Sequence, residues 1–389
     1  MGHNNTVFNE LLQLLPRHEF EKAVSARNGD RYVKYFTCWQ QFITLLYAQI
    51  RSKDSLRDIS ASLNAQAQKF YHIGLTKICR STLSDANNRR PHEVFEHLFY
   101  KLLQRCRDLT PKHKFHFKNP MYSIDATTID LCLSIFPWAK YRKTKGAMKL
   151  HFLYEHAGSL PSFLVITEGR NADIRVAKEA DFSSRLLPDS IVSIDRAYID
   201  LKWLDKLNKN KVFFITRLKS NMTPLVTGQH MALKNKHVLA DDRIILPSMF
   251  QGRGYRDELR LIVYRDPLTG KILKFITNNF SLAASTIAAV YKARWQIELF
   301  FKWIKQNLKI KSFLGTSKNA VLTQIWAAVC YYLLLTYIKY QTKFKHSLLL
   351  LCRLLRETLM EKLSLIDILS LNLRRLANLT LEDPQLQFF

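Results

Sequence analysis

The order of strand-like and helix-like segments between residues 121 and 218 most constrains what this chain can fold into. The segment YSIDATTIDLCLSIF, residues 122–136, is rich in β-branched residues and indicates a strand. After a basic loop, the pattern predicts strands near Leu150–His156 and Phe163–Thr167, a helix over Asp173–Leu187, the short strand IVSID, a helix over Ile199–Lys209, and the strand VFFITRL. This βββαβαβ order predicts an α/β fold with a mixed sheet flanked by helices.

The segments that follow this core predict an insertion and then a helix. Residues 219–285 contain the strand-like runs RIILP, ELRLIVYRD and KILKFITNN. Turns are expected at Gly252, at Gly254 and over Pro267–Gly270. A long helix is expected from Ser285 to Lys311, so residues 120–218 and 286–311 form the predicted core and residues 219–285 a β-rich insertion.

Both ends of the chain read as helical. Residues 1–110 space apolar groups at intervals of three and four, and residues 312–389 do the same. In the first region a helix opens at Ser81–Ser84 and ends at Arg89 and Arg90, which suits a helix-turn-helix. An ordinary helical bundle with a solvated basic end fits that segment equally well.

Charge and cysteine usage narrow the class of partner. Lys and Arg number 59 against 32 for Asp and Glu, so the formal net charge is +27. With 47% hydrophobic residues the chain is not a disordered basic tail, and nucleic acid or an anionic membrane surface is the expected partner. The six cysteines form no C-x-x-C pair, which favours reduced thiols and a cytoplasmic protein. Nucleoid association is expected if the partner is DNA.

The segment Ala320–Ile338 carries no charge over 19 residues, about the length needed to span a bilayer. It contains Thr323, Gln324 and Thr336 and is the single segment of its kind in the sequence. A buried helix that packs beneath or beside the predicted sheet is the favoured interpretation, and no membrane association is expected.

Two aspartates stand in strand-like surroundings. Asp125 lies inside an apolar strand, where an ionised carboxylate is costly unless it is paired or holds a cation. Asp195 ends the strand IVSID, and the carboxyl ends of strands are where α/β sheets present catalytic groups. Each could instead cap a turn or pair with a local arginine such as Arg196.

A third carboxylate lies in the predicted helix near residue 300. Tyr291, Arg294 and Lys305 fall within roughly 40° of Glu298 on a helical projection, so all four share one stripe. Such a face suits a site that acts on a phosphate backbone, although Glu298 could simply pair with Lys302 at i,i+4. Trp295 and Trp303, on the same helix, are expected in the core.

These residues together resemble a known family. Tyr291-x-x-Arg294-x-x-x-Glu298 followed by Lys305 resembles the Y-R-E-K signature of the family-four insertion-sequence transposases, which are DDE transposases. Ser-Ile-Asp125-Ala-Thr-Thr resembles the family's first aspartate region, and Ile-Asp195-Arg-Ala-Tyr198 resembles its second. The resemblance covers residues 120 to about 310 and implies an RNase H-like core.

The resemblance also implies an activity. Asp125, Asp195 and Glu298 would be the catalytic carboxylates and would hold two Mg²⁺ ions, with Mn²⁺ as a possible substitute. Arg294, Lys305, Lys302 and Tyr291 would contact DNA, although Tyr291 could simply pack. The enzyme would cut double-stranded DNA at the element's terminal inverted repeats and join the 3′-hydroxyl ends to target DNA. The N-terminal region would bind the repeats, and the C-terminal region would form a homodimer on DNA.

Two other functions are compatible with the sequence. An RNase H-like nuclease without strand transfer would use the same carboxylates, and a non-catalytic DNA-binding protein would use only the basic surface. Short inverted repeats flanking the reading frame would favour the mobile element. The scattered histidines show no zinc-like spacing.

Overall fold

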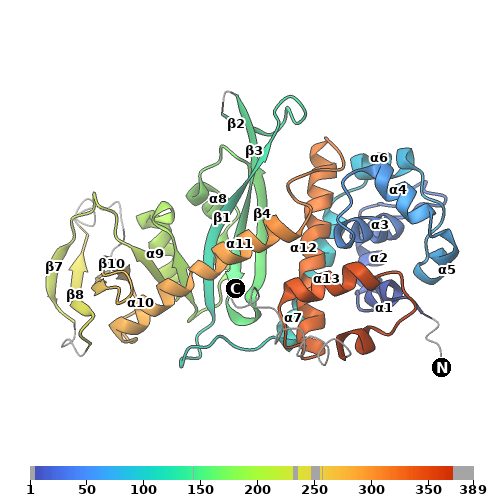
Figure 1. Cartoon of the computed structure of the whole chain (residues 1–389). Coiled ribbons are helices and arrows are strands. Elements are labelled where there is room, and N and C mark those ends of the chain that lie inside the picture. Colours follow the sequence, from blue (N-terminus) through green and yellow to red (C-terminus); the bar gives the residue numbers. More distant parts are fainter. Residues whose placement is uncertain (1–4, 143, 231–234, 247–254, 256, 371–389) are drawn as a thin grey trace. The chain divides into compact units, whose positions relative to one another are not determined.

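The computed structural model describes residues 5–142, 144–230, 235–246, 255 and 257–370 (Figure 1). The chain divides into two compact units. A sheet-containing unit comprises residues 111–303, and a helical unit comprises residues 1–110 together with 304–389. The two terminal helical regions, which the sequence suggested as separate regions, therefore belong to one discontinuous unit.

The described residues of the sheet unit form ten strands in a single sheet. The strands are β1 (Met121–Leu131), β2 (Lys140–Arg142), β3 (Lys145–Glu155), β4 (Leu160–Glu168), β5 (Ile191–Ile194), β6 (Phe213–Arg217), β7 (Leu225–Gln229), β8 (Val238–Ile245), β9 (Leu259–Arg265) and β10 (Ile272–Thr277). The helices of this unit are α8 (Asp173–Glu179), α9 (Leu201–Lys209), α10 (Ala284–Ala293) and the greater part of α11 (Trp295–Asn307).

The core of this sheet has the predicted mixed topology. Strands β1, β3 and β4 form an antiparallel meander, and β5 and β6 continue it in parallel on the other side of β1. The resulting order β4-β3-β1-β5-β6, with helices α8 and α9 in the crossovers, is that of an RNase H-like core. The predicted α/β fold class is confirmed.

The predicted insertion supplies further strands of the same sheet. Strand β10 pairs with β6, and β9, β8 and β7 follow in antiparallel order. The expected turn over Pro267–Gly270 is present: Gly270 adopts φ +68°, and the Asp266 carboxylate accepts the backbone N–H of Leu268. The expected turns at Gly252 and Gly254 lie outside the described residues.

Apolar residues cover both faces of the sheet in strict alternation. Tyr122 and Ile124 of β1 pack into a cluster with residues of α8 and α9, such as Ala177 and Leu204. Met121, one residue out of phase with them, packs in a second cluster that includes residues of α10. Successive side chains of a strand point to opposite faces, so odd-numbered positions of β1 face the α10 side.

The single long helix expected over Ser285–Lys311 is wrong in detail, because the structure has two helices that meet at Arg294. The backbone N–H groups of Arg294 and Ile297 bond carbonyls three residues back, at Tyr291 and Arg294. Bonds of this kind tighten the turn relative to the four-residue spacing of an α-helix. Arg294 therefore marks a local irregularity in the helical segment.

The helical unit is built from both ends of the chain. Its helices are α1 (Val7–Gln13), α2 (Arg17–Ala26), α3 (Cys38–Ile50), α4 (Leu56–Asn64), α5 (Phe70–Ile73), α6 (Arg80–Arg89), α7 (Glu93–Leu109), α12 (Lys318–Gln341) and α13 (Leu348–Thr358). Helix α3 begins with a capping box at Thr37 and Gln40, and nearly all of its residues are buried.

Helix α12 is the core of this unit. By length and composition it could cross a bilayer, but 94% of its apolar window is buried within the structure. It packs against α3, α6, α7 and α13, and the side chain of Gln324 bonds Lys309 O, Ser312 O and Leu314 N at 2.7–2.9 Å. The prediction of a buried helix is confirmed, and α12 belongs to the helical unit. Its packing beneath or beside the sheet stays a prediction.

The expected helix-turn-helix is also modified. Helices α4 and α6 contact each other, but a tight turn does not join them: residues 65–79, which include α5, lie between them. The side-chain amide of Asn64 spans this gap by donating to Ile78 O at 2.9 Å and accepting from Ile78 N at 3.1 Å. The end of α4 is thereby tied to the segment that leads into α6.

Candidate active site

The two aspartates lie at adjacent positions of neighbouring parallel strands. The register pairs Met121 with Ile191 and continues to Ile124 with Ile194. Asp125 is the next residue within β1, and Asp195 is the next residue after β5, at the carboxyl end of that strand. Strand alternation places Asp125 on the α10 side of the sheet, and its cross-strand partner Phe152 packs against Phe300 of α11 at 5.2 Å.

Arg294 joins Asp125 to Glu298. Its Nη1 lies 2.8 Å from Asp125 Oδ2, and its Nη2 lies 2.5 Å from Glu298 Oε1. The side chains are 13% exposed for Arg294, 21% for Asp125 and 30% for Glu298, so the pairs are largely shielded from water. Two of the three predicted carboxylates are thus within reach of one guanidinium, and Glu298 pairs with Arg294 rather than with Lys302.

Asp195 is different, because its carboxylate makes no hydrogen bond or ion pair among the described residues. Arg196, the local partner that the sequence allowed, is exposed and begins the short 3-10 helix η4 (Arg196–Tyr198). The buried hydroxyl of Tyr198 likewise has no hydrogen-bond partner in the described part of the chain. Burial raises the pKa of Tyr198 well above its usual value, and the charges of Asp125, Asp173 and Asp195 add to the shift.

Electrostatics at the site reflect an excess of negative charge. Burial raises the pKa of Asp125 to about 6; the Ala126 N–H and Arg294 oppose the shift, while Asp195 and Glu298 add to it. Burial alone would lower the pKa of Arg294, but the carboxylates of Asp125 and Glu298 and the nearby Tyr291 raise it overall. Three carboxylates and one guanidinium leave two net negative charges in a chain that is otherwise strongly basic.

The other residues of the predicted stripe lie as follows. The ring of Tyr291 packs on Phe275 at 5.0 Å, and the Arg294 guanidinium lies 5.8 Å from its centroid, which supports the packing role. Lys302 is exposed on α11. Lys305 is half-buried, about 10 Å along the helix axis from Glu298 at 1.5 Å per residue.

The expectation for the two tryptophans of this helix holds only in part. Trp295 is 58% exposed, so its assignment to the core is wrong. Trp303 is half-buried. At Trp295, local periodicity failed because the helix restarts there after Arg294.

A hydrogen-bonded chain that the sequence did not reveal connects β1 to α11. Ser123 Oγ and His156 Nε2 lie 2.8 Å apart, and His156 Nδ1 lies 3.3 Å from Gln296 Oε1. Burial lowers the pKa of His156 to about 4, with the Gln296 hydrogen bond opposing it, so the imidazole is neutral at pH 7. These three residues are 33 and 140 positions apart, and no spacing pattern could have grouped them.

The donor set suits a divalent cation. Carboxylate oxygens are the ligands that hard cations such as Mg²⁺ prefer. The site is net negative, and the Asp195 carboxylate and Tyr198 hydroxyl lack a partner among the described residues, so a hydrated cation would satisfy both. However, no group of three or more His, Cys, Asp or Glu residues in the described segments is close enough to hold a metal ion. Arg294 occupies Asp125 and Glu298 in this structure, so it would have to release them for a cation.

Comparison with known proteins identifies the family. Residues 116–334 match the family "Transposase DDE domain", and residues 3–76 match a domain of unknown function, DUF4372. A Geobacillus stearothermophilus protein named "Probable transposase for insertion sequence element IS5377" is 30% identical over 348 residues, 88% of this chain and 87% of its own length.

Two further similarities were found. A Sinorhizobium fredii protein, y4zB, assigned as a transposase, is 35% identical over 257 residues, 65% of this chain and 69% of its own. A piggyBac transposase synaptic complex with hairpin DNA gives a TM-score of 0.48 at 12% identity, over 98% of this chain and 81% of that one, too low to carry an argument. From the matched domain and the first relative, the chain belongs to the DDE transposase family and is a metal-dependent DNA transposase of the insertion-sequence type.

Proposed function

We propose that this transposase cuts DNA at the terminal inverted repeats of an insertion sequence and joins the freed 3′-hydroxyl ends to target DNA. Asp125, Asp195 and Glu298 are the proposed catalytic carboxylates. Two observations support this assignment: Asp125 and Asp195 each directly follow the last register pair of parallel strands β1 and β5, Ile124 with Ile194, and one arginine joins Asp125 to Glu298. The Y-R-E-K grouping supports placement in the family-four type.

The proposed cofactor is a pair of Mg²⁺ ions, for which Mn²⁺ would substitute. When bound, such ions activate the attacking hydroxyl and stabilise the departing oxygen in an in-line displacement at phosphorus. The protein's own contribution is to hold the carboxylates on two inner strands of the sheet and on helix α11. The Ser123–His156–Gln296 chain supports this geometry by fixing the first turn of α11 against β1.

Cations on α11 would bind the DNA backbone. Arg294 can bind two phosphate oxygens at once. Its hydrogen bonds to Asp125 and Glu298 support a role beside these carboxylates. Lys302 and Lys305 follow on the same helix and would bind neighbouring phosphates. Tyr291 would keep the Arg294 guanidinium in place through its ring.

End recognition is assigned to the helical unit, with a homodimer formed on DNA and the complex associated with the nucleoid. A fragment of residues 1–110 is not a fair test of end binding, because α12 supplies the core of that unit. Binding to end DNA should be measured with the full chain. Size-exclusion chromatography with end DNA tests the dimer: a complex containing a single chain would contradict it.

The test of the catalytic assignment is substitution of each carboxylate. Asp125→Ala, Asp195→Ala and Glu298→Ala should each abolish Mg²⁺-dependent cleavage of end DNA while binding persists, because metal ligands are lost and phosphate contacts are not. Asp130→Ala, an exposed carboxylate on the same strand as Asp125, is the matched control and should cleave normally. Wild-type cleavage by any of the three variants would remove that residue from the site.

Strand transfer is measured separately from cleavage. Joining of a pre-cut end with a free 3′-hydroxyl to a plasmid should depend on the same three carboxylates. Cleavage without joining under all metal conditions would favour the nuclease alternative.

A further inference from the structure

Helix α6 of the helical unit presents a polar face that the catalytic site does not use. We propose that this face enters the major groove of the terminal repeat and reads base edges, while Arg57 of α4 binds the phosphate backbone beside it. The inference rests on the proposed function, because it names the surface through which the enzyme would recognise its ends.

The inner face of α6 is fixed to the rest of the unit. Leu83 and Ala86 are buried, and the buried side chain of Asn87 accepts a hydrogen bond from Gln41 Nε2 at 2.8 Å. The Asn319 side chain of α12 donates to Asn87 O at 2.9 Å. A reading helix needs such a rigid base, because base contacts require placement to within a fraction of an ångström.

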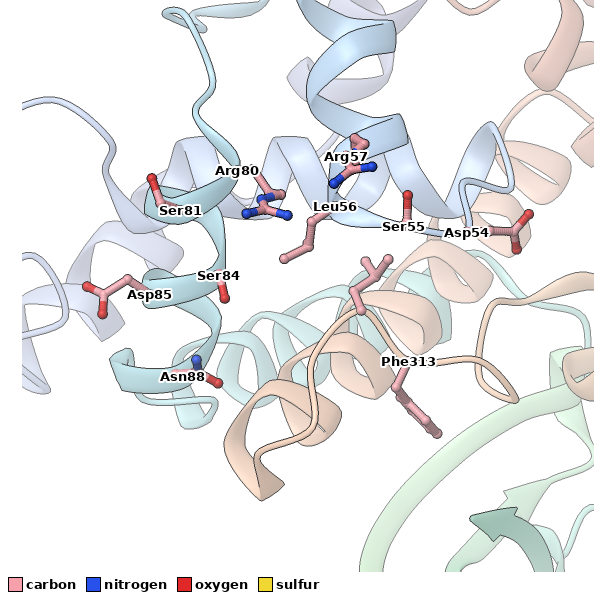
Figure 2. A pocket seen from close by; sticks show the side chains of 11 residues that line it. Asp54, Ser55, Leu56, Arg57, Arg80, Ser81, Ser84, Asp85, Asn88 and Phe313 are labelled. Atoms are coloured by element: carbon pink, nitrogen blue, oxygen red, sulfur yellow. The ribbon is translucent and has the colours of Figure 1, made fainter. Parts of the chain in front are cut away.

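The outer face of α6 carries only polar side chains. Five positions form one stripe along the helix and line a groove of about 840 Å³ between α6 and the start of α4 (Figure 2): Arg80, Ser81, Ser84, Asp85 and Asn88. Arg, Ser and Asn are side chains that pair with donor and acceptor groups on base edges in the major groove. Asn88 Oδ1 already accepts from Ser317 Oγ at 2.7 Å, so the side-chain NH₂ is the group that Asn88 offers to a base. Residues near the start of a recognition helix make such contacts in known complexes.

The start of α4 forms the other wall of this groove. Ser55 caps α4 by accepting the N–H of Asp58 at 3.1 Å, and Arg57 follows in the first turn with an exposed side chain. In helix-turn-helix proteins the first helix crosses the DNA backbone while the second lies in the groove. Here the Asn64–Ile78 hydrogen bonds tie the end of α4 to the segment before α6, so the two helices can take these roles without a tight turn between them.

The charge balance of the groove favours an anionic partner. Its two aspartates are already neutralised, Asp85 by Arg89 at 2.8 Å and Asp54 by Lys309. Arg57 and Arg80 make no ion pair among the described residues, and Figure 2 shows both guanidinium groups along the groove. The remaining charge is therefore positive, which complements DNA phosphate.

The chemistry of the face also separates duplex DNA from other occupants. A protein partner would be expected to bury large apolar or aromatic anchors, and single-stranded DNA would stack on aromatic rings. The five side chains of the α6 stripe include neither kind, whereas the other lining residues of the groove include Leu56, Phe313 and Leu314. Base reading is therefore proposed for the α6 stripe alone. A helix with a hydroxyl, amide and guanidinium surface matches the hydrogen-bonding pattern of a duplex groove.

The test uses the full-length protein, without metal, and two duplexes: the repeat taken from the DNA flanking the gene and a scrambled version. Arg80→Ala and Asn88→Ala should each lower the preference for the repeat by about 5- to 150-fold, the discrimination expected of a good base contact. Thr82→Ala, an exposed position of α6 absent from the described groove lining, is the matched control and should keep the preference. Circular dichroism melting confirms that each variant is folded.

Arg57→Ala should behave differently, because a phosphate contact carries no sequence information. This variant should bind both duplexes more weakly by the same factor, and it should lower the slope of log affinity against log salt by about 0.9. Lys22→Ala, an exposed cation of α2, is its control and should leave the slope unchanged. Substitution of each guanine of the repeat in turn by 7-deazaguanine adds a second readout. One such substitution should lower the DNA affinity of the wild type but should not lower the affinity of Arg80→Ala any further.

The outcomes separate this inference from the proposed function. A wild-type chain that binds both duplexes equally would contradict end recognition itself. A wild-type chain that prefers the repeat, with the preference intact in Arg80→Ala and Asn88→Ala, would overturn the assignment to α6 alone. Variants that keep the preference but lose self-association would identify the face as a protein interface and also overturn it.

Discussion

Replacement of Arg294 by methionine should destabilise the metal-free protein and tighten its binding of divalent cations. The guanidinium makes two charge-assisted hydrogen bonds, to Asp125 at 2.8 Å and to Glu298 at 2.5 Å. Such bonds contribute about 1.5–3 kcal/mol each. Because the carboxylates are 21% and 30% exposed, the lower end applies, and the two together stabilise the site by about 3 kcal/mol.

Calorimetry of the metal-free protein measures this loss. At about 2–4 °C per kcal/mol for a unit of this size, the transition of the sheet unit should fall by about 6–12 °C. Arg196→Met removes an exposed arginine beside Asp195 that makes no ion pair in the described segments, and should change the transition little. The comparison separates the loss of two specific bonds from the loss of one positive charge.

Cation binding should change in the opposite direction. A divalent ion that takes Asp125 and Glu298 in the wild type must first displace the guanidinium, and about 1.4 kcal/mol corresponds to a tenfold change in affinity. The Kd for Mn²⁺, measured by electron paramagnetic resonance without DNA, should therefore be about 10- to 100-fold lower in Arg294→Met. An unfolding transition and a Kd both equal to those of the wild type would refute the view that Arg294 competes with the metal.

The sign of the pH dependence follows from Asp125. Its pKa is raised from 3.8 to about 6, so its contribution to stability is present below about pH 4 and is lost as the pH rises through 6. Without Arg294 this pKa rises further, so the loss extends to higher pH. The stability difference between wild type and Arg294→Met should thus be small near pH 4 and increase up to pH 8.

Three other predictions concern single groups. In EDTA, the free energy of unfolding of Asp125→Asn should vary less between pH 4 and 6 than that of the wild type. The Mn²⁺ affinity of the wild type, measured by titration calorimetry, should fall about tenfold for each pH unit below pH 6. Lys302→Ala and Lys305→Ala should each lower the salt slope of DNA binding by about 0.9, and an unchanged slope would place that residue outside the interface. Arg260→Met should lower the free energy of unfolding in urea by about 3–5 kcal/mol, because it leaves the buried carboxylate of Asp241, 5% exposed, without its buried arginine partner. A decrease below about 1 kcal/mol would contradict this.

Local patterns predicted the sheet core and singled out two aspartates that the structure places next to each other on neighbouring strands. Asp125 lies within an apolar strand and Asp195 directly follows one, and both are signals carried by a few neighbouring residues; the structure places them on adjacent inner strands. Glu298 was found because it is a lone carboxylate among cations on a helical stripe. Each of these signals is carried by residues close together in the chain.

The features that the sequence did not predict depend on contacts between distant residues. Nothing near Arg294 indicates that its partners are Asp125, 169 positions away, and Glu298 at the same time. The apolar character of α12 required burial but did not specify which unit would bury it. The insertion strands β8, β9 and β10 were predicted from the sequence, whereas β7 was not. The pairing of β10 with β6 is a long-range contact that local periodicity does not encode.

The discontinuous helical unit has a consequence for synthesis on the ribosome. Helices α1–α7 emerge first, but α12 follows only after residues 111–303 have been translated. Until then the apolar faces of α3 and α7 have no core helix to cover them. A gene copy truncated within the sheet unit would therefore yield an unstable product that chaperones and proteases would remove, and it would not occupy the ends of intact copies of the element.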